Sequence, residues 1–208
     1  RWIKTRLFAW INNAQREITL LKPDAYPVLT VHGPLAAGTK QALPTGHSHF
    51  IKAIRNMGTS GTAAGNAVSF IEMDDINTVQ YDWHSQSGTS VVELYTFDPS
   101  NPANFYVYPP QPAAAQGYLE IISTKSPADM DGASGAYTTA ITLDDIYYNP
   151  MLEYVLHKAH QWQAPNSQYS AQMSQIHYNS FVTLIGRKDL AEYQSLPYEL
   201  KKKSSPQG

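Results

Sequence analysis

The sequence predicts an α+β protein: an antiparallel helical bundle formed by N- and C-terminal helices, with an antiparallel β subdomain inserted between them. At both ends of the chain, apolar residues recur with the 3.6-residue period of an amphipathic helix. The middle of the chain instead holds short apolar runs separated by Pro and Gly, which is typical of strands joined by turns. The expected parts are an N-terminal helix, a β-rich insert, a helical hairpin and a flexible tail, over residues 1–22, 23–142, 143–195 and 196–208.

The first helix is predicted from Thr5 to Leu21, and Pro23 is expected to end it. We expect its apolar stripe to cover the two C-terminal helices, because no other long amphipathic segment is available to do so. The stripe consists of Leu7, Trp10, Ile11, Ala14, Ile18 and Leu21. Because the chain lacks an initiator Met, we expect the true start to lie upstream of Arg1.

Strands and one short helix are predicted in the insert. A short helix is expected after Asp74, through Ile76 and Val79 to Trp83. The strands are expected at four apolar runs, Val28–Val31, Phe50–Arg55, Ala67–Met73 and Tyr118–Thr124, which favour a half-buried sheet.

A hairpin is predicted from Val91–Phe97 and Phe105–Tyr108, joined through the turn at 98–104. Pro109, Pro110 and Pro112 are expected to stop its second strand, because proline cannot donate to a strand ladder. The aromatic residues of the hairpin predict either an arm that contacts a neighbouring subunit or the tail, or ordinary packing within the sheet. These residues are Tyr95, Phe97, Phe105, Tyr106 and Tyr108.

Two helices are predicted near the C-terminus as an antiparallel hairpin. Asn149 is the expected N-cap of the first, with Pro150 at its first position, where the missing N–H costs nothing. Pro165 separates it from the second helix, which is expected to begin at Asn166 or Ser167 and to end at Gly186. The expected apolar faces are Met151, Leu152, Val155, Leu156 and Ala159 in the first helix, and Tyr169, Met173, Ile176, Phe181 and Leu184 in the second.

The composition favours a protein that contacts other proteins. Charged residues make up 15% of the 208 residues, against about 25% in ordinary soluble domains, while Tyr reaches 14 copies and Trp 4. Subunit interfaces show this bias, but a Tyr-rich β domain would show it too. The net charge of -2 supplies no general attraction for nucleic acid, and the absence of Cys excludes disulfides and Cys-ligated zinc.

Candidate metal sites are weak. His157 and His160 are three residues apart on one predicted helix face, yet no third ligand stands at a matching spacing, so two surface histidines are the better interpretation. His47 and His49 alternate around Ser48 without a neighbouring carboxylate. The run 129–132 resembles the start of a calcium loop but lacks the later acidic ligands, so we interpret it as a turn.

Catalytic signals are equally thin. The Gly-rich run 58–65 lacks the Lys and Ser or Thr that would reach a phosphate, which favours a mobile β-loop. The acidic pairs at 74–75 and 144–145 precede helical patterns, where helix capping explains them. The sequence therefore predicts no catalytic residue, no cofactor and no metal site, and we do not expect the protein to be an enzyme. No membrane-spanning or secretory segment is visible.

The chain resembles a family of head-to-tail adaptor (connector) proteins of tailed bacteriophages over nearly all of Leu7 to Leu196. The order of several short segments carries this resemblance, since none of them is chemically diagnostic by itself. The segments are 7–18 with Lys22-Pro23-Asp24-Ala25, 38–44, Ile54-Arg55-Asn56 with its Gly-rich continuation, Phe97-Asp98-Pro99, 105–110, and 143–147 through Tyr154-Val155-Leu156.

The resemblance implies a virion structural protein that forms a ring, most often of twelve subunits. The ring binds the portal protein and carries a downstream tail or nozzle protein. Such a ring closes the packaged head and lines the DNA path at ejection. It implies a location in the virion neck, with assembly in the host cytoplasm and no membrane contact. The alternatives are a tail completion or other neck protein, a DNA-binding protein, or a hydrolase.

The C-terminal tail is predicted to be flexible, because it is polar and poor in apolar residues. In the family that the chain resembles, this tail commonly docks on the portal. The residues expected to do so are Leu196, Pro197, Tyr198, Leu200, Lys201, Lys202 and Lys203. The three lysines either stay solvated or contact DNA in the channel.

Overall fold

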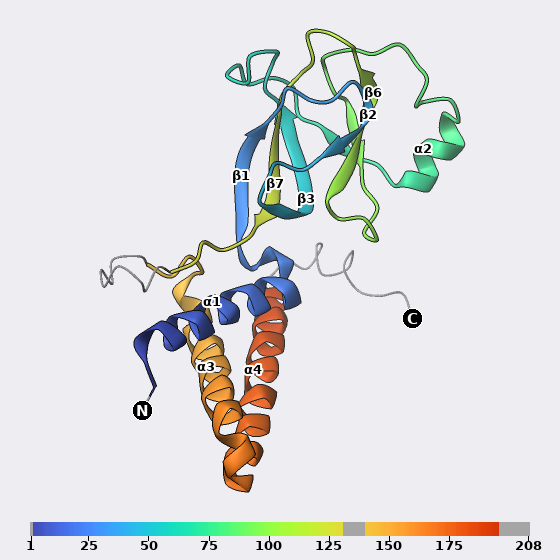
Figure 1. Ribbon diagram of the computed structural model, residues 1–208. Helices are drawn as coiled ribbons and strands as arrows, with labels where there is room; N and C mark the ends of the chain where they lie inside the picture. The colour runs from blue at the N-terminus through green and yellow to red at the C-terminus, as the bar shows by residue number, and fades with distance from the viewer. Residues whose placement is uncertain (1, 131–139, 196–208) are drawn as a thin grey trace. The chain divides into compact units, whose positions relative to one another are not determined.

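The protein has an α+β fold, as the sequence predicts. The computed structural model describes residues 2–130 and 140–195, and for 188–195 only the backbone (Figure 1). Contacts within the chain define two compact units. The helical unit comprises Arg1–Lys22 and Pro127–Gly208, and the β unit comprises Pro23–Ser126.

The helical unit contains three long helices: α1 (Lys4–Leu21), α3 (Tyr148–Gln163) and α4 (Gln168–Ser195). The predicted first helix is confirmed, and a 3₁₀ turn at Pro23–Ala25 follows it directly. α3 and α4 form a helical hairpin through a 3₁₀ turn at Ala164–Asn166, and α1 crosses α3 (Figure 1).

Two of the predicted helix ends are wrong. Asn149 lies inside α3, because a 3₁₀ turn at Asp145–Tyr147 precedes the helix and starts it earlier. The Asp144 carboxylate caps this turn by accepting a hydrogen bond from the Ile146 N–H at 2.9 Å. Gly186 does not end α4, which continues to Ser195. A glycine stops a helix when it turns to positive φ, and Gly186 does not.

The predicted start of α4 is confirmed. The Ser167 hydroxyl accepts a hydrogen bond from the Ser170 N–H at 3.2 Å, as an N-cap side chain does. The buried face of α4 differs from the predicted one, since Tyr169 and Ile176 are exposed. Its buried residues within 168–187 are Ser170, Ser174, Phe181 and Ile185.

Small and polar side chains explain the shifted face of α4. The Ser174 hydroxyl lies 3.0 Å from Nδ1 of His157 on α3 and the Ser174 carbonyl 2.9 Å from the same nitrogen, so the polar groups are satisfied inside the interface. A serine side chain also lets two helices approach closely. A pattern of apolar residues alone could not reveal such an interface.

The β unit contains two sheets. β1 (Pro27–His32), β7 (Leu119–Lys125) and β3 (His47–Asn56) form an antiparallel sheet in the order β1-β7-β3. The second sheet has the order β2-β6-β5-β4, in which β4 pairs with β5 in parallel and the other neighbours are antiparallel. Its strands are β2 (Gly38–Ala42), β6 (Asn104–Gln111), β5 (Leu94–Thr96) and β4 (Ser69–Phe70).

The predicted hairpin is present as β5 and β6. Its second strand ends directly before Pro112, as expected, but Pro109 and Pro110 do not stop it. β6 passes through Pro109 and Pro110 to Gln111. A proline carbonyl still accepts, and the Thr89 N–H donates to the Pro110 oxygen at 2.9 Å, while the Glu93 N–H donates to the Tyr108 oxygen at 2.8 Å. On the edge of β6 that pairs with residues 89–93, the carbonyl groups of β6 accept these hydrogen bonds, so the missing N–H of proline is not needed there.

Two other elements are shorter than expected. The predicted strand at 67–73 is reduced to β4, because the chain turns at Met73 into helix α2 (Met73–Val79). α2 ends before Trp83, which lies in the following turn. The acidic pair Asp74 and Asp75 occupies the first turn of α2, where the helix dipole favours negative charge.

The core of the β unit lies between residues of both sheets. Phe50 of β3 stacks on Phe105 of β6, with ring centroids 4.4 Å apart and an interplanar angle of 11°. This stack links the two sheets, and apolar burial of this kind supplies the main stabilising term. The buried cluster around it consists of Leu35, Ala53, Val68, Val92, Tyr95, Val107, Leu119 and Ile121.

Buried side-chain amides hold the connecting segments of this unit. The Asn56 amide donates to the Val92 oxygen and accepts from the Val92 N–H, both at 2.8 Å. Gln41 makes the same two-point contact with the backbone of Ala36, at 2.8 and 2.7 Å. The Gln111 side chain donates to the Thr89 oxygen at 3.0 Å and accepts from the Gly117 N–H at 2.8 Å.

Replacing Asn56 with Ala should destabilise the protein by about 3 kcal/mol, because it leaves the buried N–H and carbonyl of Val92 without partners. Chemical denaturation monitored by circular dichroism measures this loss. The control is Asn66→Ala. The Asn66 side chain is exposed, so this substitution should change the free energy of unfolding by less than about 0.5 kcal/mol. Equal stability of the two variants would contradict the role of Asn56.

Candidate interaction surfaces

The aromatic residues of the predicted contact hairpin lie on both sides of the second sheet. Tyr95 and Phe105 belong to the core, with 7% and 0% of their surface exposed. Phe97 packs at the edge of that core, and Tyr106 and Tyr108 are half-buried. The packing within the sheet accounts for Tyr95 and Phe105, so a contact with a neighbour would have to use the other three.

The segment after α2 covers Tyr106 and Tyr108. The Tyr108 hydroxyl lies 3.0 Å from Oε1 of Gln80 and 3.1 Å from Oε1 of Gln86. Trp83 is buried and lies edge-on to Tyr106, with ring centroids 6.3 Å apart. These contacts fix the segment on the sheet, and they leave the neighbouring side chains of Val79 and Tyr81 largely exposed.

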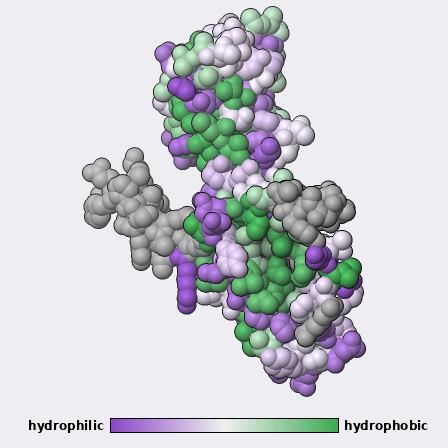
Figure 2. Space-filling model, turned by 90° about the vertical axis from the view of Figure 1, so that its left-hand side faces the viewer, coloured by the Kyte–Doolittle hydropathy of each residue, from purple (hydrophilic) through white to green (hydrophobic). Residues whose placement is uncertain are grey.

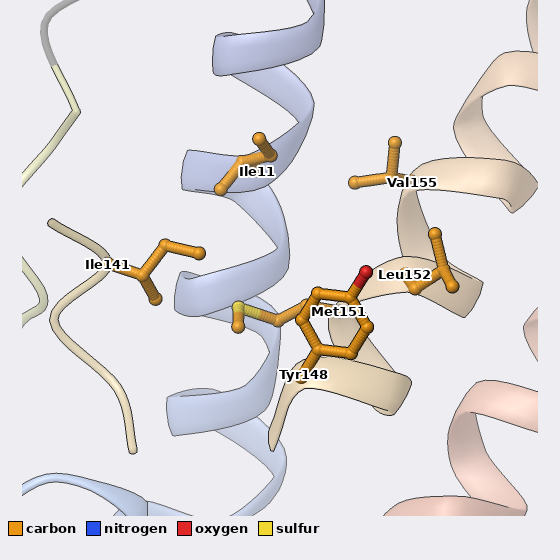
Figure 3. Close-up of a pocket in the computed structure, with 6 residues that line it drawn as sticks. All are labelled: Ile11, Ile141, Tyr148, Met151, Leu152 and Val155. Carbon is orange, nitrogen blue, oxygen red and sulfur yellow. The ribbon is translucent and has the colours of Figure 1, made fainter. Parts of the chain in front are cut away.

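The helical unit carries an apolar groove that no sequence pattern indicated. Figure 3 shows its side chains converging from α1, from α3 and from the segment before α3. The groove encloses about 150 Å³. Its lining residues are Ile11, Ile141, Tyr148, Met151, Leu152 and Val155. In Figure 2, a green area of apolar residues lies in the middle of the lower part of the view, bordered by hydrophilic residues.

Buried amides of α1 position the chain on either side of residues 131–139. The Asn12 side chain donates to the Met130 oxygen at 3.2 Å and accepts from the Met130 N–H at 2.8 Å. The Gln15 side chain accepts from the Thr142 N–H at 2.9 Å. Because Ile141 adjoins Thr142, the Gln15 bond also fixes one wall of the groove.

Arg16 and Asp129 form an exposed ion pair in the same region, with Nη2 at 2.5 and 2.6 Å from the two carboxylate oxygens. The Asp129 carboxylate is therefore already paired with an arginine. The run 129–132, interpreted above as a turn, lies in part outside the described residues.

The predicted histidine pair of α3 faces α4 and is half-buried, which corrects the interpretation as surface residues. His157 contacts Ser174, and the His160 ring stacks on the His177 ring at 5.4 Å. Nδ1 of His177 lies 2.8 Å from Oε2 of Glu153. Among the side chains that the structure describes, those of residues 2–130 and 140–187, no group of three His, Cys, Asp or Glu is arranged to hold a metal ion.

The other predicted features are distributed over both units. His47 and His49 lie on β3, where Nδ1 of His47 is 2.7 Å from the Ser123 hydroxyl and Nδ1 of His49 is 3.0 Å from the Ser48 hydroxyl. The Gly-rich run includes Gly58 and Gly61 at positive φ, as a tight loop requires. The seven tail residues predicted to bind the portal lie outside the described residues.

Comparison with known proteins identifies the family. Residues 1–199 match the family described as SU10 adaptor protein, which is a phage head-to-tail adaptor family. The chain belongs to this family. No curated protein matches the chain. Among the described helices of this SU10 adaptor family member, none has the length and apolar character needed to cross a membrane.

The sequence could not predict the groove of this adaptor family member, because the groove depends on how α1 packs against α3. Leu152 and Val155 were expected on the apolar face of α3, but nothing indicated that α1 would leave them partly uncovered. The periodic pattern shows that a residue is apolar. It does not show whether the chain itself covers that residue.

Acid should weaken the helical unit through His157. Burial lowers the pKa of His157 below its ordinary value of about 6.5, although its hydrogen bond to Ser174 acts in the opposite direction. The unfolded chain therefore takes up this proton at a higher pH than the folded chain, and the free energy of unfolding falls as the pH decreases from about 6.5 toward the lowered value.

Denaturation of the wild-type chain and of His157→Gln between pH 7.5 and 5 measures this effect. The variant should lose less stability over that range than the wild-type chain does. Part of the pH dependence should remain, because burial also lowers the pKa of His32 and of His47. An identical pH dependence in both proteins would exclude the role of His157.

Proposed function

We propose that this chain is a non-enzymatic structural subunit of the virion neck, a head-to-tail adaptor that connects the portal protein to a downstream tail or nozzle protein. The match to an adaptor family over residues 1–199 carries this proposal. The exposed apolar groove of the helical unit supports it, since large apolar surfaces mark sites of protein contact.

The subunits form a closed ring, with twelve as the proposed copy number. Subunits that repeat around an axis contact one another through two different surfaces, and the contact closes into a ring when the rotation permits. In this proposal α1, α3 and α4 act as one bundle from both ends of the chain, and the β unit is the insert. The ring closes the packaged head and lines the path of DNA at ejection.

Two partner contacts extend the proposal. The tail residues Leu196, Pro197, Tyr198, Leu200, Lys201, Lys202 and Lys203 dock on the portal, and the three lysines contact DNA in the channel. The half-buried rings of Phe97, Tyr106 and Tyr108 supply a contact with a neighbour or with the tail protein. Their partial exposure within the chain supports this role.

Phage particles made without this chain should have packaged heads that lack tails and lose their DNA. Electron microscopy of the particles and the amount of nuclease-resistant DNA measure the two effects. In wild-type particles, mass measurement of the neck should give twelve copies per portal vertex. Intact, infectious particles without the chain would contradict the proposed function, and six copies would favour a tail completion protein.

Deletion of residues 197–208 should weaken attachment to the portal and leave the two folded units intact. Co-sedimentation with purified portal rings measures attachment, and circular dichroism with thermal denaturation measures folding. The matched control replaces the three lysines at 201–203 with glutamine, which separates a loss of charge from a loss of the whole segment. Undiminished attachment of the truncated chain would exclude portal docking by the tail.

A further inference from the structure

We propose that the groove between α1 and α3 receives the outer face of α4 from a second copy of this chain, and that this contact joins neighbours in the ring. The inference rests on the proposed function and names the surfaces that its ring would use. The outer face of α4 is the stripe formed by Tyr169, Met173 and Ile176.

The groove has the size and chemistry to receive an apolar side chain from another chain. Its volume of about 150 Å³ equals that of engineered cavities that take up a benzene-sized molecule. Leu152 is 42% exposed at its rim, and Met151 forms its buried floor. Its lining offers an incoming side chain little besides hydrocarbon, so the occupant must be apolar.

The stripe on α4 is the complementary surface. Tyr169 is 66% exposed and Ile176 is 53% exposed, while Met173 between them is half-buried. Residues spaced by four and three positions lie on one helix face. That face lies about a third of a turn away from the one that packs on α3, where Ser174 and Phe181 are buried. The described part of the chain thus leaves Tyr169 and Ile176 of the predicted apolar face largely exposed, although Phe181 of the same predicted face is buried.

The groove and the stripe are separate surfaces of the helical unit, so one copy can use both at the same time. On α3, Glu153 and His157 face α4 through their contacts with α4 side chains. Leu152 and Val155 line the groove on the other side of the same helix. A heterologous contact between these two surfaces can repeat from one copy to the next around an axis.

Charge supports the same pairing. When the rotation axis runs along the helices, every α4 points the same way, so the neighbour's α4 lies antiparallel to α3. Arg187 then lies about 16 Å beyond Ile176 along α4, and Asp145 lies about 15 Å from Val155 toward the start of α3. Arg187 and Asp145 are both exposed, so the contact brings opposite charges to the same end of the groove.

Cysteine cross-linking in assembled phage particles tests the contact, because the chain contains no Cys of its own. Particles that carry L152C together with I176C should give a ladder of covalent oligomers after treatment with a short bis-maleimide. Particles that carry L152C or I176C alone should give monomers, because a heterologous contact pairs two different positions. Denaturing gel electrophoresis of the particles resolves these products.

The matched control pairs L152C with V182C. Val182 is 45% exposed, similar to Ile176, but it lies on another side of α4. This control should give a ladder at least tenfold weaker than that of L152C with I176C. A ladder of equal strength from the control, or dimers from I176C alone, would overturn the proposal.

Failure of the contact and failure of the proposed function give different results. If the chain is present in the neck in many copies and L152C with I176C yields monomers, the groove is not the subunit contact while the adaptor role stands. If the chain is missing from particles, both proposals fail. A charge swap adds an independent result: R187E or D145R alone should reduce incorporation into particles, and R187E with D145R should restore it. No restoration would overturn the proposed orientation.

Discussion

Both units of the chain depend on buried side-chain amides that bond to backbone outside the helices and strands. Asn12 and Gln15 do this in the helical unit, and Gln41, Asn56 and Gln111 do it in the β unit. A buried backbone group without a partner costs about 1–3 kcal/mol, so irregular segments can be buried only where such partners exist. The amide is neutral and both donates and accepts, which suits a chain with few charged residues.

These bonds fix the irregular segments in a chain that has no Cys for disulfides, and the apolar surface that remains can serve contacts with other chains. In the helical unit, Gln15 holds the backbone beside Ile141, and α1 packs on α3 without covering Leu152. The groove is therefore a consequence of how the chain satisfies its own backbone. An isolated domain gains nothing from such a groove, whereas a subunit of a ring can use it.

The sequence predicted most helices and strands because their signals are local. The period of α1 and the alternation of β7 depend on neighbouring residues, and Ser167 caps α4 through its own side chain. The prediction failed where distant partners decide. β6 continues through Pro109 because Glu93 and Thr89 donate from another segment, and Ser174 is buried because it meets His157.

The candidate surfaces were harder to predict than the fold. For Tyr95 and Phe105 the sequence left open a contact with another chain or ordinary packing within the sheet, and both lie in the core, because alternate residues of a strand face opposite sides. The groove joins three separate segments, so no single pattern predicts it. The family resemblance was confirmed because the order of many short segments is a property of the whole chain.

A cryo-EM reconstruction of the phage neck, at a resolution that shows side chains, tests the central claim most directly. The account predicts that each α4 lies against the groove between α1 and α3 of the adjacent copy, within a ring attached to the portal. A ring in which that groove faces solvent, with the copies joined through their β units, would contradict it.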